Sequence, residues 1–224
     1  LPNEIYSLKL LSDDNETSIA ISDIKPVGIA LSVNNLQTRV ALSFKTNPES
    51  LKLLGGKTFN LAVHNGGEMR LIPFNFNNAL EANLIIENNN LFSGINIFTL
   101  FDDKNNAILE RLYFNYEGIK TNSVETVSTK QIRDSLKLNL KFTDFTAEKF
   151  SSLSISVLPS ETKSYTNHNN ILSSIYVQPY LKGAIENGAY YFTNINRKTT
   201  YDLDLLLLTQ GWSSYNWSTI FKGP

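Results

Sequence analysis

The chain has 224 residues, 42% hydrophobic and 11% aromatic, so it can bury a sizeable core. Its 20 basic and 21 acidic residues give a formal net charge of −1, which disfavours a nucleic-acid-binding protein because such proteins usually have a basic excess. The absence of cysteine excludes disulfides, zinc–thiolate sites, iron–sulfur clusters and thiol catalysis within the chain. No apolar run approaches the roughly 18–20 residues of a transmembrane helix.

The first half of the chain is typical of a β-sandwich or barrel. Short runs of alternating apolar and polar residues recur at a spacing of roughly 8–12 residues. Asn65-Gly66 lies between two such runs and favours a type I′ hairpin turn, in which both central residues have positive φ. Asp and Asn residues predict a second hairpin at 102–106. The predicted strands are residues 5–11, 17–21, 27–33, 39–44, 58–64, 69–76, 80–87, 95–101 and 108–116.

A polar stretch rich in Thr and Ser, residues 118–130, predicts a linker between two modules. After it, apolar and polar residues alternate at 136–142 and again at 153–157. This pattern predicts half-buried strands of an antiparallel sheet.

The periodicity then changes and predicts three helices. The first covers residues 170–176, and the second runs from Pro179 to a C-terminal cap at Gly188. The third covers residues 202–210, with Thr199 or Thr200 as its N-terminal cap and Gly211 at its end. Residues 205–208 of this helix are all leucine, so we expect it to be well buried.

These elements predict a mainly β fold of immunoglobulin-like antiparallel β-sandwich modules, with a helical insertion in the C-terminal part. We expect one sandwich at residues 1–117, a linker at 118–130 and a second β module at 131–224. The second module holds the insertion, at about 169–212, and is expected to be incomplete at its C-terminal end. Residues 1–4 lack the basic and apolar regions of a signal peptide, and we expect the chain to be an excised fragment.

The sequence offers little catalytic chemistry, and we predict no catalytic, cofactor-binding or metal-binding residue. It has two histidines, His64 and His168, which are expected to lie in turns or on the surface. The nucleophile elbow Gly-x-Ser-x-Gly and the phosphate-binding glycine loops are both missing. Two acidic segments, residues 13–16 and 102–106, could ligate calcium, but solvated turns are the favoured interpretation because neither matches the 12-residue calcium loop.

The aromatic C-terminal region is the one candidate contact site, and two interpretations of it stay open. Trp212, Tyr215 and Trp217 could form a platform that binds a carbohydrate, a peptide or another partner. The favoured alternative is that Trp212 and Trp217 pack the last helix onto a sheet, because buried aromatic residues dominate core energetics.

Two stretches carry a resemblance to a known family. Residues 91–102 and 107–114 resemble the end of a macroglobulin-like domain, as found in large bacterial envelope proteins related to alpha-2-macroglobulin. Residues 170–192 and 203–212, with the motif Thr209-Gln210-Gly211-Trp212, are similar to the segment that follows this domain in the same proteins. The family tends to have basic residues after Gly-Trp, where this chain has Ser213-Ser214, and the thioester chemistry of some members needs a cysteine that this chain lacks.

The resemblance implies sandwiches of the macroglobulin type and supplies no catalytic residue. Some of these proteins also contain segments that resemble the plug of TonB-dependent receptors. We therefore expect a non-catalytic structural or interaction module, periplasmic or on the cell surface in association with the outer membrane. Its expected partners are other domains of a larger envelope protein or other proteins. A carbohydrate- or peptide-binding module is the alternative, and an enzyme is disfavoured.

Overall fold

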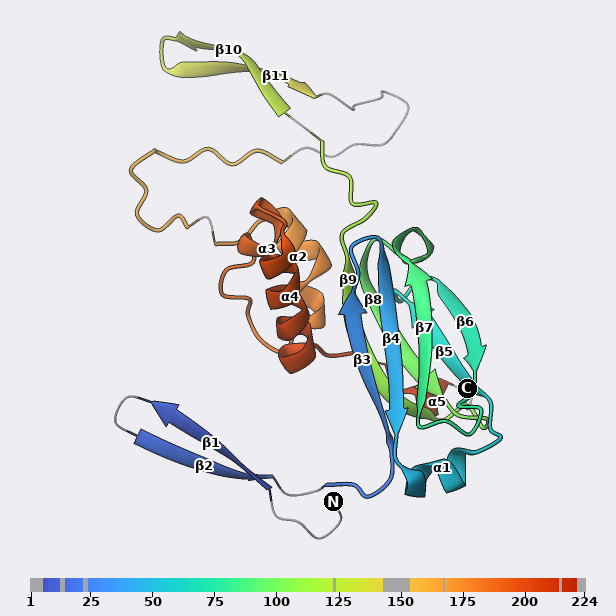
Figure 1. Cartoon of the computed structure of the whole chain (residues 1–224). Helices are drawn as coiled ribbons and strands as arrows, with labels where there is room; N and C mark the ends of the chain where they lie inside the picture. Colours follow the sequence, from blue (N-terminus) through green and yellow to red (C-terminus); the bar gives the residue numbers. More distant parts are fainter. Residues whose placement is uncertain are drawn as a thin grey trace.

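Two antiparallel sheets stack face to face in the body of the molecule. The computed structural model describes residues 6–12, 15–21, 24–122, 124–142, 154–166, 168–213 and 215–220. One sheet has the strand order β3-β4-β7 and the other β6-β5-β8-β9 (Figure 1). This arrangement confirms the mainly β fold, and every strand predicted in the first half is present. The seven strands of the sandwich are β3 (Ile29–Asn35), β4 (Arg39–Thr46), β5 (Phe59–His64), β6 (Met69–Phe74), β7 (Glu81–Glu87), β8 (Gly94–Phe101) and β9 (Ala107–Asn115).

The core between the two sheets is aliphatic and aromatic. Leu42 and Phe44 of β4 are fully buried, and they share one hydrophobic cluster with Phe98 and Leu100 of β8 in the opposite sheet. The rings of Phe44 and Phe74 lie 4.5 Å apart between their centroids. Side chains of a strand point alternately to its two faces, so every second residue contributes to this core.

The hairpin between β5 and β6 is confirmed, but its predicted turn type is wrong. His64 pairs with Met69, which leaves residues 65–68 as the loop. Positive φ occurs at Gly66 (90°) and not at Asn65. Instead, Asn65 Oδ1 accepts hydrogen bonds from the backbone N–H groups of Gly67 and Glu68, at 2.9 Å each. The side-chain oxygen of Asn65 thus accepts the hydrogen bonds that close the turn, and the backbone of Asn65 does not adopt the positive φ that was predicted.

Two short elements of the sandwich have no counterpart among the predictions. Helix α1 (Pro48–Leu54) begins after Asn47, whose side chain accepts from Ser50 N at 2.8 Å. A capping asparagine followed by proline was the available sequence signal. A single 3₁₀ turn, η1 (Asn88–Asn90), follows β7.

The C-terminal part is helical, as expected, but one predicted helix is absent and two short helices were not predicted. Helix α2 (Ile171–Tyr176) is confirmed, whereas the helix predicted at 179–188 is wrong. That segment holds only the 3₁₀ turn η2 (Gln178–Tyr180) and a loop closed by Gln178, which accepts from Ile185 N and donates to Gly183 O. Short helices α3 (Tyr190–Thr193) and α5 (Trp217–Ile220) were not expected.

Helix α4 (Arg197–Gln210) starts earlier than predicted and ends at Gly211 as predicted. Its cap is Asn196, not Thr199 or Thr200. Thr199 lies in the first turn, where its hydroxyl accepts from Asn196 N at 2.8 Å and completes a capping box. Both partners of this reciprocal pair had to be recognised to place the start of the helix.

The helices form a third layer against the outer face of the four-stranded sheet. Leu203 and Leu207 of α4 pack with Val177 and Leu181 onto this face, where Phe114 and three other sheet residues meet them. Every residue of β8 is buried as a result. The expectation that α4 is well buried is only partly right, because its remaining leucines include the exposed Leu205 and Leu208. The sheet residues of this layer are Ile95, Ile97, Leu112 and Phe114.

Two hairpins stand apart from the sandwich (Figure 1). One pairs β1 (Tyr6–Ser12) with β2 (Asn15–Ile21), and the other pairs β10 (Val124–Ile132) with β11 (Ser135–Phe142). Residues 124–130 of the segment predicted as a linker form most of strand β10, and the linker assignment itself stays a prediction. Its alternation is weak in sequence because Thr126, Thr129 and Gln131 occupy the positions that pair with the three leucines of β11.

The second strand predicted beyond the linker, at residues 153–157, is wrong where it can be compared. Residues 154–157 are neither strand nor helix, and residue 153 lies outside the described residues. The division into modules at 1–117 and 131–224 stays a prediction. The structure adds that the helices beyond residue 170 share a hydrophobic cluster with the first sandwich.

Candidate functional site

The predicted contact residues lie along the chain segment that leaves α4. Gly211 ends the helix and pairs with Leu181 in an isolated bridge, and Trp212 N donates to Tyr180 O at 2.8 Å. A Cβ atom at Gly211 would lie 2.1 Å from Leu207 O, so no other residue fits there without a backbone shift. The Thr209–Trp212 motif therefore has a local structural role. The indole of Trp212 remains 49% exposed.

Tyr215 and Trp217 pack back onto the outer face of the four-stranded sheet. Their rings stack with centroids 5.5 Å apart, and each meets His64 edge-on at 5.2 Å. Trp217 also meets Phe101 edge-on at 5.1 Å. Both residues are half-buried. The three predicted contact residues are thus separated: Tyr215 and Trp217 cover the sheet, and Trp212 presents its indole at the surface.

Glu110 of β9 is the polar centre of this contact. Its Oε2 accepts three hydrogen bonds, from Thr99 Oγ1 at 2.9 Å, from Trp217 Nε1 at 2.8 Å and from Ser213 Oγ at 3.2 Å. Two of these donors belong to the C-terminal segment, so Glu110 fastens that segment to the sheet. Sequence reasoning missed Glu110; a carboxylate in an apolar strand was the only signal.

His64 extends this network and is not the surface or turn residue that was predicted. It is 3% exposed, and its Nε2 lies 3.2 Å from Thr99 Oγ1. Because the Thr99 hydroxyl donates its one hydrogen to Glu110, we infer that Nε2 carries a proton and donates to Thr99. Burial lowers the pKa of His64, and the negative charge of Glu110 opposes this shift. The Thr99 hydroxyl is thus held between His64 and Glu110, and no lone pair of the His64 imidazole points toward it.

The next residue of β9, Arg111, fastens α4 in a similar way. Its Nη2 donates to both carboxylate oxygens of Asp204, at 2.9 and 2.8 Å, and its Nη1 donates to Leu112 O at 2.6 Å. Burial raises the pKa of Asp204, and the Arg111 charge opposes the rise. Burial, together with the Asp204 charge, raises the pKa of nearby Tyr113 to about 12. This pair could not be predicted from sequence because its members are 93 residues apart.

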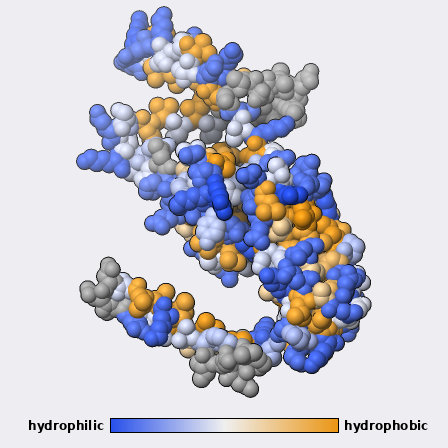
Figure 2. Space-filling model, viewed as in Figure 1, coloured by the Kyte–Doolittle hydropathy of each residue, from blue (hydrophilic) through white to orange (hydrophobic). Residues whose placement is uncertain are grey.

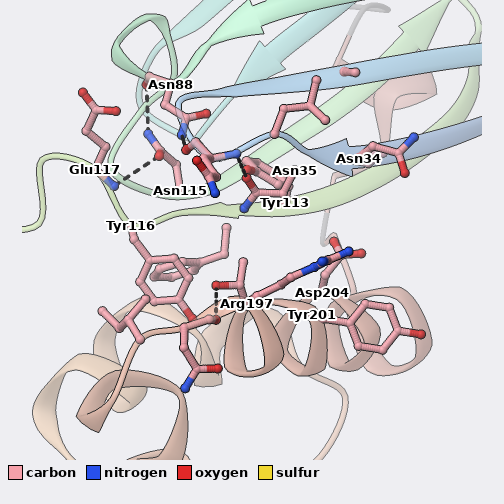
Figure 3. Close-up of a pocket in the computed structure, with 18 residues that line it drawn as sticks. Asn34, Asn35, Asn88, Tyr113, Asn115, Tyr116, Glu117, Arg197, Tyr201 and Asp204 are labelled. Atoms are coloured by element: carbon pink, nitrogen blue, oxygen red, sulfur yellow. Dashed lines mark hydrogen bonds between the residues drawn. The ribbon is translucent and has the colours of Figure 1, made fainter.

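A cleft of about 1040 Å³ opens between the sandwich and α4 (Figure 3). The end of β3 and the β3–β4 turn form one wall, the first half of α4 forms the other, and the end of β9 lies between them. Asn88 Nδ2 donates to Gln37 O at 2.7 Å, and Asn115 Nδ2 donates to Asn88 O at 3.0 Å. Asn88 Oδ1 is buried, and no described residue donates a hydrogen bond to it.

The acidic turn at 102–106 uses its carboxylate within the turn. Asp102 Oδ1 accepts from Lys104 N and Asn106 N at 2.8 Å each, and Oδ2 accepts from Asn106 Nδ2 at 2.9 Å. In the other acidic segment, Asp13 and Asp14 lie outside the described residues, and Glu16 forms an ion pair with Lys9 at 2.7 Å. The described residues contain no cluster of three or more His, Cys, Asp or Glu side chains that could hold a metal ion.

Each of the two hairpins has one apolar and one polar face. In β1–β2, Leu8 pairs with Ile19 and Tyr6 pairs with Ile21, so these four side chains share a face, while Lys9 and Ser18 point to the other. Figure 2 shows hydrophobic residues gathered along one side of this hairpin. In β10–β11 the even-numbered residues from 136 to 142 form the apolar face. Leu8 is 51% exposed and Leu136 is 56% exposed, so neither face is covered by the sandwich.

Comparison with known proteins adds no relative to this description. No protein family, no curated protein and no solved structure matches the chain. Among the described residues, no helix is both long enough and apolar enough to cross a membrane.

Proposed function

We propose that the chain is a non-catalytic structural and interaction module of a larger bacterial envelope protein, periplasmic or associated with the outer membrane. The observation that carries this proposal is the pair of amphipathic hairpins. A two-stranded hairpin alone is marginally stable in water, and three or more strands or a packing partner are needed for independent stability. Each hairpin therefore calls for a covering surface on its apolar face, and neighbouring domains would supply it.

The envelope assignment rests on the family resemblance of residues 91–114 and 170–212. In such proteins, the macroglobulin-like domain is one part of a larger chain and is followed by further segments. A hairpin on either side of a complete sandwich suits that plan, because each can join its strands to the next module. A link to TonB-dependent transport belongs to the same proposal.

Hydrogen–deuterium exchange tests the module assignment on the full-length protein as the cell makes it. We expect amides of residues 6–21 and 124–142 to be protected in the full-length protein and to exchange fast in the 224-residue chain. Amides of β8 should be protected in both. Equal, fast exchange of both hairpins in the two proteins would contradict the proposal, and cell fractionation that finds the protein in the cytoplasm would contradict its location.

Matched substitutions separate the hairpin faces from general surface effects. Leu8→Lys and Leu136→Lys should abolish the protection of their hairpins in the full-length protein. Leu53→Lys is the control, since Leu53 is 61% exposed on α1 and lies outside both hydrophobic clusters. The control should leave exchange unchanged.

A second candidate, a carbohydrate- or peptide-binding module, is favoured by the half-exposed indole of Trp212 alone. Tyr215 and Trp217 contribute less surface to it because their rings pack on His64 and on each other. A glycan array probed with the chain and with Trp212→Ala tests it. Binding that the substitution removes supports this function, and the absence of any binding across the array rejects the carbohydrate interpretation.

A further inference from the structure

The cleft between the sandwich and α4 has an apolar rim that no described element covers. Leu36, at the β3–β4 turn, is 45% exposed, and Ile195, just before α4, is 53% exposed. Tyr201 is 65% exposed on the same wall as Ile195. Single exposed apolar residues are common, but three of them around one concave site mark a surface for binding. The volume of about 1040 Å³ lies at the upper end of the range for ligand sites.

The wall of the cleft also holds a polar atom without a partner. Asn88 is 6% exposed, its amide nitrogen is used by Gln37 O, and its Oδ1 is the single buried side-chain acceptor in the described residues that receives no hydrogen bond. Buried acceptors are almost always satisfied by a protein group or by an ordered water. Asn88 Oδ1 is closed to solvent, so a ligand in the cleft would reach it only if Asn88 moved, and it sets no requirement on the ligand.

Strand β3 offers backbone groups at the same place. It is an edge strand that pairs only with β4. Leu36 N donates to Arg39 O at 2.8 Å, so Leu36 and every second residue before it form hydrogen-bonded pairs with β4. Because hydrogen-bonding direction alternates along an antiparallel strand, the backbone groups of Val33 and Asn35 point away from β4. Both residues line the cleft, and an extended chain could pair with them.

The charge of the helix wall favours an acidic ligand. Arg197 is exposed in the first turn of α4, and its side chain lies along the side of the helix that faces the sandwich (Figure 3). The N-terminal end of the helix dipole adds positive potential there. Asp204, on the same wall, is already neutralised by Arg111, and the other carboxylate of the cleft, Glu117, lies on the sandwich side and is directed away from the helix (Figure 3). A carboxylate near Arg197 would complement this charge.

We propose that this cleft binds an extended acidic peptide segment by addition to β3. Its backbone pairs with Val33 and Asn35, an aliphatic side chain fills the space between Leu36 and Ile195, and a carboxylate meets Arg197. At about 3.3 Å per residue, the wall from Val33 to Gln37 accommodates about five residues. A saccharide could also occupy the cleft, but it would use neither the strand edge nor the positive charge of Arg197.

A positional-scanning library of acetylated and amidated pentapeptides tests the proposal on the whole chain. We expect selection of an aliphatic residue at one position and of Asp or Glu at another. N-methylation of the central amide in the best peptide should weaken binding at least tenfold, since it removes a backbone donor without changing the protein. Arg197→Glu should also weaken it at least tenfold, and a glutamate in the first helical turn is compatible with folding.

Lys182→Glu is the matched control, because Lys182 is exposed and lies beside the C-terminal end of α4 through its hydrogen bond to Gln210 O. It should leave peptide affinity within twofold of wild type. The hairpin variants Leu8→Lys and Leu136→Lys should do the same, so that this site can fail without the proposed module function failing. No selected peptide, equal binding of the N-methylated peptide, or amide shifts at Val33 and Tyr201 with chitotetraose or maltotetraose instead would overturn the proposal.

Discussion

Strands β8 and β11 are both rich in apolar residues, yet they occupy opposite environments. β8 lies between β5 and β9, with the three-stranded sheet on one face and the helices on the other, and all its residues are buried. β11 pairs with β10 alone, and most of its residues are exposed. The number of layers that cover a strand decides its burial, and the sequence of the strand does not reveal that number.

The largest effect on stability is expected from a matched pair of alanine substitutions, one in each strand. Phe98→Ala in β8 should lower the free energy of unfolding by about 3–5 kcal/mol, since Phe98 is fully buried between the sheets. Leu136→Ala in β11 should change it by less than about 0.5 kcal/mol, as for other surface sites. Urea denaturation of the chain measures both. Similar losses for the two variants would mean that the hairpin is part of the cooperative unit.

The attachment of the helical layer depends on Arg111 and Asp204. Asp204→Ala should cost about 2 kcal/mol, because it leaves a nearly buried guanidinium without its partner; the loss is smaller than for a fully buried pair because 30% of the Asp204 side chain is exposed. Hydrogen exchange of α4 amides should increase more than that of β8. The double variant Arg111→Met with Asp204→Leu should recover much of the loss, and failure to recover would assign the effect to helix packing instead.

We expect the hydrogen bonds of the C-terminal segment to contribute less to stability than the Arg111–Asp204 pair. Glu110→Gln replaces a charged acceptor of three hydrogen bonds by a neutral one, and we expect a loss of about 1 kcal/mol. The fluorescence of Trp217 should shift to longer wavelength as its indole becomes more exposed. Glu125→Gln, in exposed strand β10, is the control and should change neither quantity. An unchanged Trp217 signal in Glu110→Gln would show that ring stacking alone holds the segment.

The smallest expected effect is the pH dependence that His64 contributes. Its folded-state pKa lies below the ordinary value of 6.5, so the unfolded chain binds the proton more readily. The stabilising contribution of His64 is therefore complete above pH 6.5 and decreases as the pH falls from there to the folded-state pKa. The free energy of unfolding should show this decrease, and His64→Gln should remove it. A pH dependence that persists in the variant would have to come from other groups.

The local elements could be predicted largely from sequence, and their associations could not. Alternation located the strands of the sandwich because each has at least one face in a core. It failed at β10, where Thr and Gln pair with the leucines of β11, and at residues 154–157, which have the alternation but no strand partner among the described residues. The turn at Asn65 was misjudged because its side-chain Oδ1 accepts from Glu68 N in place of a backbone carbonyl. The cap at Asn196 was misjudged because Thr199, also of a capping residue type, lies in the first turn of the helix.

The candidate sites divide in the same way. Trp212, Tyr215 and Trp217 were recognisable as an aromatic cluster in sequence, but only the structure places Trp212 at the surface and the other two over His64. The cleft residues lie in four segments far apart along the chain, around residues 33–41, 88, 113–117 and 195–204, and none of those segments carries a motif.

The sequence by itself determined the mainly β architecture, the positions of most strands and the helical character of the C-terminal part, because these follow from periodicity and turn residues within short windows. Tertiary structure alone decided which faces are covered. It buried His64 under the C-terminal aromatic residues, joined Arg111 to Asp204, opened the cleft beside α4 and left the two hairpin faces exposed. These features depend on distances between residues far apart in the chain, and those distances are fixed only when the layers pack.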